Sequence, residues 1–466
     1  MTTISRWLRL TILVTLLVGL VSRFVELEAS PPGFYLDEAI IAAHAICLRE
    51  TGSDAYGQHL PLFSAVADGL ATPVQLYGSA AWTVIFGDSI ASLRAWSAFV
   101  STITIGAIAL LVWKWGFEAS AATWAAMLAA ISPWAFQFSR IAWDPPLAPC
   151  FLVLGMLALF WSAGALSALL AGASFALAMY SYPPLRVQVL LLAPALVLLL
   201  RAEKSFTWRR VAIVAFAATV VLTPIVLRNS AGELLRRSRA LSIFSDAYLE
   251  PLGGFSMPRV IGIFLSNFFS HFSWSYLLVS GDANVRHSTQ LFGEWSWIDG
   301  VLMVLAFVLL LKRKLFERAP EASLRKRVLC FAIYGYATGV IPAALTNDGL
   351  PHALRSIAAW PFLVIGLALV ADRLGELSQH FPGLLGTASL VYFCFFLSQY
   401  FSNYPTFSRH AFHAGVEKAA LLSESRDDWR LFDRYVGNYI DIGKYYYYMH
   451  YGHERCGQVA KHKPRQ

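Results

Sequence analysis

The chain has 466 residues, of which 57% are hydrophobic and 14% are charged. Soluble globular proteins carry about 25% charged residues, so this composition excludes an ordinary soluble protein and indicates extensive contact with lipid. The formal net charge is +8. Because Lys and Arg fall mostly in short loops between apolar stretches, this charge is typical of membrane topology and not of nucleic-acid binding.

Apolar stretches long enough to cross a membrane recur along the chain. A spanning helix needs about 20 mostly apolar residues. We predict eleven spans, at 7–27, 89–112, 119–139, 147–163, 165–180, 187–200, 211–227, 298–311, 328–345, 356–371 and 384–400. The segment 72–86 is also apolar but contains Pro73 and Gly78, and it fits either a short span or a helix lying at the interface.

The basic loops determine the expected orientation. If 72–86 is interfacial and the N-terminus is inside, the basic loops 201–210 and 312–327 both lie inside, as the positive-inside rule expects. We therefore predict an all-α integral membrane protein, a polytopic helical bundle with its N-terminus inside, its C-terminus outside and interfacial helices in its first outer loop. The predicted main domain is 1–400, with outer loops 28–88, 140–147, 181–186, 228–297 and 346–355, followed by an extracytoplasmic tail, 401–466.

The cysteines show no recognisable framework. The five residues are Cys47, Cys150, Cys330, Cys394 and Cys456, and none forms a CxxC pair. Three of them lie in or beside apolar spans, where cysteine behaves as a small core residue. The spacing predicts neither a disulfide framework nor a zinc site.

Two adjacent carboxylates, Asp37 and Glu38, follow the first span in the segment PPGFYLDEA. Acidic side chains suit the start of a helix, where Asp37 would be an N-cap. A carboxylate at a partly dry membrane surface can instead have a raised pKa suited to proton transfer. The residues alone leave both hypotheses open.

A second acidic loop, SRIAWDPP, contains Arg140 and Asp144. An Asp before Pro is typical of an ordinary turn, and Arg140 would then be an interfacial anchor. The predicted topology places Asp144 on the same side as Asp37. Two carboxylates there could bind an acceptor hydroxyl, a divalent cation such as Mg²⁺ or Mn²⁺, or both.

Basic residues begin two predicted spans on the outer side. Arg186 follows Tyr182, and Arg355 follows His352. The side chains could extend to lipid headgroups, or each Arg could bind a phosphate bidentately.

The longest outer loop contains three polar residues close together beside aromatic ones. These are Asp282, Arg286 and His287, and they fit either a solvated turn or a substrate contact. The chain has no phosphate-binding GxxxxGK[ST] loop, Rossmann glycine motif or GxSxG elbow, which disfavours nucleotide-driven chemistry on a soluble domain.

Together these motifs resemble the polyprenyl-phosphate-sugar-dependent glycosyltransferases of the GT-C fold. The nearest resemblance is to bacterial relatives of the protein O-mannosyltransferases and the aminoarabinose lipid A transferases. It covers roughly residues 1–400 and is carried by PPGFYLDEA, FGDSIASLRAWSA, SPWAFQFSRIAWDPP and DGLPHALRS.

The resemblance implies transfer of a sugar from a polyprenyl-phosphate donor on the extracytoplasmic side, with inversion, to a lipid, glycan or protein acceptor. Asp37 would activate the acceptor hydroxyl, Glu38 would support it and Asp144 would help shape the site. From their position at the start of outer-side spans, Arg186, His352 and Arg355 are the candidate donor-phosphate ligands. Further candidate substrate contacts are Arg140, Tyr182, Asp282, Arg286 and His287.

These expectations place the protein in the cell inner (plasma) membrane as a multi-pass enzyme. The alternative is a polytopic transporter or flippase for a lipid-linked or small polar substrate. Such a protein would use charges within its spans, whereas most charges here lie at the ends of spans.

Overall fold

The computed structural model describes residues 3–66, 69–228, 233–317, 321–415 and 456. These residues form two compact units. We call residues 24–99, 139–144 and the described part of 400–466 the loop unit, and residues 3–23, 100–138 and 145–399 the helical unit. Most of the predicted tail lies outside the described residues.

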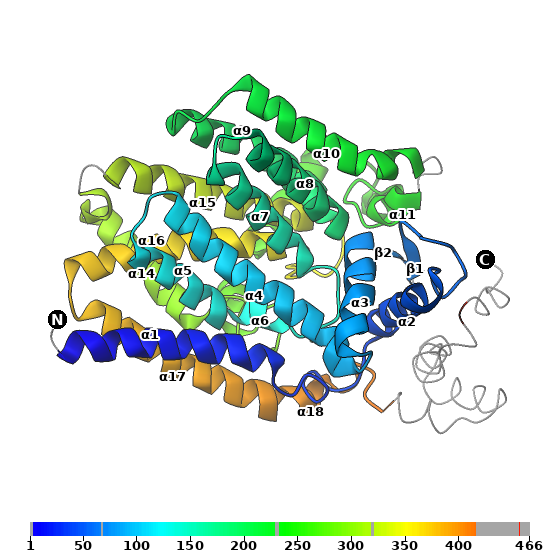
Figure 1. Cartoon of the computed structure of the whole chain (residues 1–466), viewed down its shortest axis with the longest axis horizontal. Helices are drawn as coiled ribbons and strands as arrows, with labels where there is room; N and C mark the ends of the chain where they lie inside the picture. Colours follow the sequence, from blue (N-terminus) through cyan, green and yellow to red (C-terminus); the bar gives the residue numbers. More distant parts are fainter. Residues whose placement is uncertain (1–2, 67–68, 229–232, 318–320, 416–455, 457–466) are drawn as a thin grey trace. The chain divides into compact units, whose positions relative to one another are not determined.

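The helical unit consists almost entirely of helices (Figure 1). Its helices are α1 (Thr3–Val21), α4 (Ile90–Lys114, from residue 100 onwards), α5 (Ala119–Ile131), α6 (Pro133–Phe138), α7 (Leu147–Trp161), α8 (Ala165–Ser181), α9 (Pro184–Ala202), α10 (Trp208–Arg228), α11 (Glu233–Ala240), α12 (Asp246–Leu249), α13 (Met257–Ser270), α14 (Trp297–Leu311), α15 (Glu321–Ala344), α16 (Trp360–Leu377) and α17 (Phe381–Ser402, to residue 399). Short turns of 3-10 or π helix connect some of them: η3 (Glu250–Leu252), η4 (Ser275–Val279), η5 (Lys314–Phe316) and η6 (Ile357–Ala359).

The loop unit contains the smaller elements. These are η1 (Ser22–Phe24, shared with the helical unit), α2 (Leu36–Thr51), α3 (Pro73–Phe86), α18 (Tyr404–Ser408) and an antiparallel pair of strands, β1 (Ser64–Val66) and β2 (Gly69–Ala71). The pairing register aligns Ser64 with Ala71 and Val66 with Gly69. Helices α2 and α3 pack against each other through Ala45, Leu48, Leu76 and Ala80.

The helices confirm the fold class predicted from composition. Six helices are long and apolar enough to cross a membrane, by length and composition, and five shorter apolar helices accompany them. Each of the eleven predicted spans coincides with one of these helices. The protein is therefore an all-α, multi-pass membrane protein.

Helix α16 is central to the helical unit. It packs on α5, α14 and α15. Its residues from Trp360 to Arg373 are all buried except Gly366. Helices α8 and α10 approach closely because Gly172 has no side chain. A Cβ at Gly172 would lie 2.2 Å from the Val214 carbonyl oxygen, so this contact depends on a small residue, as is common between membrane helices.

The segment 72–86, which the sequence left undecided, forms α3. Unlike the eleven helices that match predicted spans, α3 is neither one of the candidate spans nor one of the shorter apolar helices found in the described residues. This favours the interfacial alternative.

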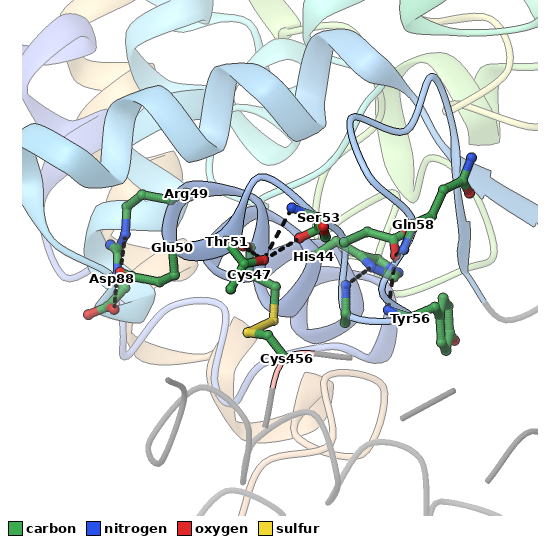
Figure 2. The surroundings of a disulfide bond; sticks show 12 residues. His44, Cys47, Arg49, Glu50, Thr51, Ser53, Tyr56, Gln58, Asp88 and Cys456 are labelled. Carbon is green, nitrogen blue, oxygen red and sulfur yellow. Dashed lines mark hydrogen bonds and ion pairs between the residues drawn. A yellow bond between two sulfur atoms is a disulfide. The ribbon is translucent and has the colours of Figure 1, made fainter. Parts of the chain in front are cut away.

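Two details differ from the sequence expectations. The predicted span 119–139 is divided at Ser132, because Pro133 starts a new helix, α6, and disfavours helical backbone in the residue before it. The expectation of no disulfide is wrong. Cys47 of α2 and Cys456 form one, with their Cα atoms 5.5 Å apart (Figure 2). Their separation of 409 residues leaves no local spacing to detect.

Candidate functional site

Glu38 is buried and bonded on all sides within the loop unit. Its side chain is fully inaccessible, and its carboxylate accepts two hydrogen bonds from the Arg94 guanidinium, at 2.9 and 2.8 Å. It also accepts the backbone N–H groups of Tyr35, at 3.0 Å, and Ala142, at 2.8 Å. Four bonds to one carboxylate leave no side for a substrate, so these contacts favour a positioning role for Glu38.

Arg94 holds the chain that leads into α2. Its guanidinium donates to the carbonyl groups of Leu27, Pro31 and Gly33, at 2.7 to 2.8 Å, besides pairing with Glu38. A buried guanidinium needs both a counter-ion and acceptors for its remaining N–H groups, and this segment supplies them. Arg94 was part of a motif singled out in the sequence but was not assigned a role there.

Asp37 directly precedes Glu38, the residue that pairs with Arg94. The N-cap of α2 is Tyr35, and Asp37 lies in the first turn, so the hypothesis that Asp37 itself is the N-cap is wrong. Glu38, the third residue of the helix, accepts the backbone N–H of the N-cap residue Tyr35. The Asp37 side chain remains partly exposed, and its Oδ2 accepts a bond of 3.4 Å from the Trp143 indole N–H.

Asp144 directly follows Trp143, whose indole N–H bonds to Asp37, so both carboxylates lie in one part of the loop unit. Asp144 is partly exposed, and its Oδ1 accepts a 2.8 Å hydrogen bond from the Thr72 hydroxyl. Burial raises the pKa of Asp144 to about 7, hydrogen bonds from Thr72 oppose this shift, and the charge of Asp37 adds to it. We call Asp37 and Asp144 the acidic pair.

The loop that carries Asp144 is anchored at two residues that precede it. The Ala142 N–H bonds to Glu38, and Arg140 donates to the carbonyl groups of Val25, Glu26 and Ser30 at 2.6 to 3.2 Å. Arg140 is fully buried and lies against the rings of Tyr400 and Phe401. Its contacts favour an anchoring role over the substrate contact suggested by the sequence.

A second cluster lies within the helical unit. Asp282, His287 and His352 bring their ligand atoms within 4.8 Å of one another, and all three side chains are buried. We call them the triad. Among the described residues, the triad is the one group of three or more His, Cys, Asp or Glu side chains that could hold a metal ion. The sequence placed Asp282 and His287 together but assigned His352 separately to the donor phosphate.

The triad rests on two further buried residues that the sequence did not single out. The His271 Nε2 accepts the backbone N–H of His352, at 3.0 Å, and its Nδ1 bonds to the Asn267 carbonyl. Burial lowers the pKa of His271 to about 4, so this ring is neutral. Glu294 accepts the Asp282 N–H, and burial raises the pKa of Glu294 well above its usual value.

Of the remaining predicted site residues, Arg355 contacts the triad, because its backbone N–H donates to His352 Nδ1 at 3.4 Å. Arg355 donates to Asp348 at 2.5 Å and to the Thr346 hydroxyl at 2.8 Å. The Nε of Arg186 donates to the Met179 carbonyl at 3.4 Å. The Arg286 carbonyl accepts a bond from Gln137. Tyr182 is the C-cap residue of α8.

No protein-family model matches the chain, and no curated protein matches it in sequence. Among solved structures, apo ArnT from Cupriavidus metallidurans has 16% identity and a TM-score of 0.51, over 98% of this chain and 78% of that one. ArnT bound to undecaprenyl phosphate has 15% identity and a TM-score of 0.49, over 98% and 77%. The apo Archaeoglobus fulgidus oligosaccharyltransferase has 14% identity and a TM-score of 0.48, over 92% and 60%. The chain shares the fold of apo ArnT, which confirms the GT-C fold expected from the sequence.

Proposed function

We propose that the protein is a membrane glycosyltransferase, which transfers a sugar from a polyprenyl-phosphate donor to an acceptor hydroxyl with inversion at the anomeric carbon. The observation that carries this proposal is the acidic pair. Asp37 accepts the Trp143 indole N–H and Asp144 is the next residue, bonded to Thr72, in a chain with the ArnT fold. Paired, partly buried carboxylates are suited to proton transfer near neutral pH.

The two carboxylates divide the work as follows. Asp37 accepts the proton of the acceptor hydroxyl as its oxygen attacks the anomeric carbon and the bond to the lipid phosphate breaks. Asp144, held by Thr72, acts in its ionised form, because its negative charge beside Asp37 makes Asp37 a stronger base. Glu38, Arg94 and Arg140 position the two loops and do not touch substrate.

The leaving group is a lipid phosphate, whose developing charge needs preorganised cationic groups. Arg186 is the stronger candidate for binding this phosphate. Among the described residues, the hydrogen bond found for its guanidinium involves Nε alone. Arg355 is a weaker candidate because its guanidinium already pairs with Asp348. Tyr182 and Arg286 remain candidate substrate contacts on the sequence resemblance alone.

The Cys47–Cys456 disulfide supports the proposed side of the reaction. Disulfides persist in oxidising compartments and are rare in the cytosol, and Cys47 belongs to α2, the helix that carries Asp37. We infer that the loop unit lies outside the cytoplasm and that the protein resides in the inner (plasma) membrane. This placement agrees with the orientation derived from the basic loops.

The test is donor consumption by purified protein with a panel of polyprenyl-phosphate sugars, in parallel arms with Mg²⁺, Mn²⁺ or a chelator. Asp37→Asn removes the proposed base and should abolish transfer while leaving membrane insertion unchanged. Asp88→Asn is the matched control, because Asp88 is another carboxylate of the loop unit, paired with Arg49 and 45% exposed (Figure 2). Full activity of Asp37→Asn, or no consumption of any donor by the wild type, would overturn the proposal.

A further inference from the structure

We propose that Asp282, His287 and His352 bind a zinc-class divalent metal ion. The proposal concerns the helical unit alone and does not depend on the proposed glycosyl transfer. It would add a structural metal site that joins the loop after η4 to the loop between α15 and η6.

The ligand atoms have spacings close to those of a metal site. The Asp282 Oδ2 lies 2.8 Å from His287 Nδ1 and 3.6 Å from His352 Nδ1. With zinc bonds of about 2.1 Å in tetrahedral geometry, ligand atoms are about 3.4 Å apart. The third pair, His287 and His352, lies within 4.8 Å. An ion would fit if His287 moves about half an ångström from Asp282 and the two imidazole nitrogens approach about 3.4 Å. His287 would then carry its proton on Nε2, and His352 Nδ1 would give up the 3.4 Å bond from the Arg355 N–H.

The charges in the triad also favour a cation. Asp282 is 2% exposed, and a buried carboxylate is costly unless it is paired. Among the described residues, its only ion-pair partners are the two imidazoles. These two rings stack with their centroids 4.8 Å apart, so both present a ring nitrogen to the same carboxylate. A divalent cation bound between them would neutralise that carboxylate.

The surrounding hydrogen bonds hold the ligands in place. The Asp282 Oδ1 accepts the Asn284 N–H and its Oδ2 accepts the Ala353 N–H, both at 2.8 Å. The Ala353 bond leaves a second lone pair on Oδ2 for a metal. The backbone N–H of His352 is fixed by His271. Partners of this kind orient metal ligands and raise metal affinity.

The donor set selects the class of metal. Two imidazoles and one carboxylate suit Zn²⁺, whereas Mg²⁺ and Ca²⁺ prefer oxygen ligands alone. This differs from the Mg²⁺ or Mn²⁺ expected from carboxylates in the sequence. Three protein ligands leave a fourth position for water or an anionic oxygen. The competing explanation is a hydrogen-bonded clamp without metal, in which His287 donates permanently to Asp282.

The experiment measures metal directly in tag-free protein, since a polyhistidine tag would itself bind zinc. The purified full chain is incubated with ZnCl₂, freed of unbound metal and analysed by mass spectrometry. We expect one zinc per chain, and in cobalt-loaded protein the visible absorption of a tetrahedral site. Loss of a residue that only orients a ligand typically weakens metal binding by roughly tenfold or more. Because His287→Ala removes a ligand itself, it should weaken zinc binding by at least this factor.

His271→Gln and His380→Ala are the matched controls. The first alters a buried histidine that contacts the triad without being a ligand, and the second removes an exposed histidine. Both should keep zinc more tightly than His287→Ala. Wild-type protein without stoichiometric zinc and without the cobalt spectrum would overturn the proposal, whether or not the variants fold. So would His287→Ala that retains wild-type zinc.

Discussion

The hydrogen bond from Thr72 to Asp144 provides a sharp test of the acidic pair. Thr72→Val removes the hydroxyl that donates to the ionised form of Asp144 while keeping the side-chain volume. Thr72 is the N-cap residue of α3, but its side chain makes no capping bond, so the substitution should leave the helix intact. The pKa of Asp144, about 7 in the wild type, should therefore rise.

The size of the rise follows from the strength of the bond. Hydrogen bonds to charged groups contribute about 1.5–3 kcal/mol. Asp144 is partly exposed, so water will replace some of this bond. We therefore take a value just below this range, about 1.4 kcal/mol, which equals about one pKa unit. If transfer requires ionised Asp144, the acidic limb of the kcat/KM profile should move from near pH 7 to about pH 8. At pH 7 the rate should fall about fivefold, with an unchanged alkaline plateau.

The assay is donor consumption between pH 5 and about pH 9, with Thr72→Ser as the control because it keeps the hydroxyl. A Thr72→Val profile with the wild-type midpoint would refute the reasoning, as would a lowered plateau without a shift. A stability measurement checks the sign independently. Because burial raises the folded-state pKa of Asp144, the folded protein holds an extra proton between about pH 4 and pH 7. Wild-type stability relative to Asp144→Asn should therefore decrease as pH rises through this window.

Three further predictions concern the framework. Glu38→Ala leaves Arg94 buried without its counter-ion and should lower the free energy of unfolding by about 3–5 kcal/mol; Glu38→Gln, which keeps an acceptor, should cost less in thermal unfolding. Gly172→Leu should push α8 from α10 and cost about 1–3 kcal/mol, whereas Gly106→Ala, with open space around its Cβ position, should be tolerated. Maleimide-polyethylene glycol should label three cysteines in the unfolded, unreduced protein and five after reduction, because three are free and two form the disulfide; Cys47→Ser should raise the unreduced number to four.

Hydropathy predicted the helices well. Because polar groups are costly in lipid, each spanning helix requires a continuous stretch of mostly apolar residues. Pro133 disfavours helical backbone in the residue before it, so the sequence contained a signal for the division of the span. Hydropathy missed this signal because the residues on both sides are apolar. The Cys47–Cys456 bond carries no such signal, because its partners are far apart in the chain and share no spacing.

The candidate site was less predictable because adjacent residues have opposite environments. Asp37 and Glu38 are neighbours in sequence, but the second is fully buried against Arg94 while the first is partly exposed. One step along a helix turns a side chain by about 100°, so hydropathy cannot separate the two roles. Likewise Asp282 and His287 are close in sequence, whereas His352 joins them only through tertiary packing.

The charged side chains of the loop unit can be sorted by what they contact, and this sorting limits where chemistry can occur. Glu38, Arg94 and Arg140 are fully buried and bonded to protein. Their replacement should reduce stability and activity together, because each holds the backbone that presents Asp37 or Asp144. Asp37 is partly exposed, so its replacement should reduce activity while stability is retained. A variant of Arg94 that kept full stability but lost transfer would therefore contradict the division between positioning and reacting groups.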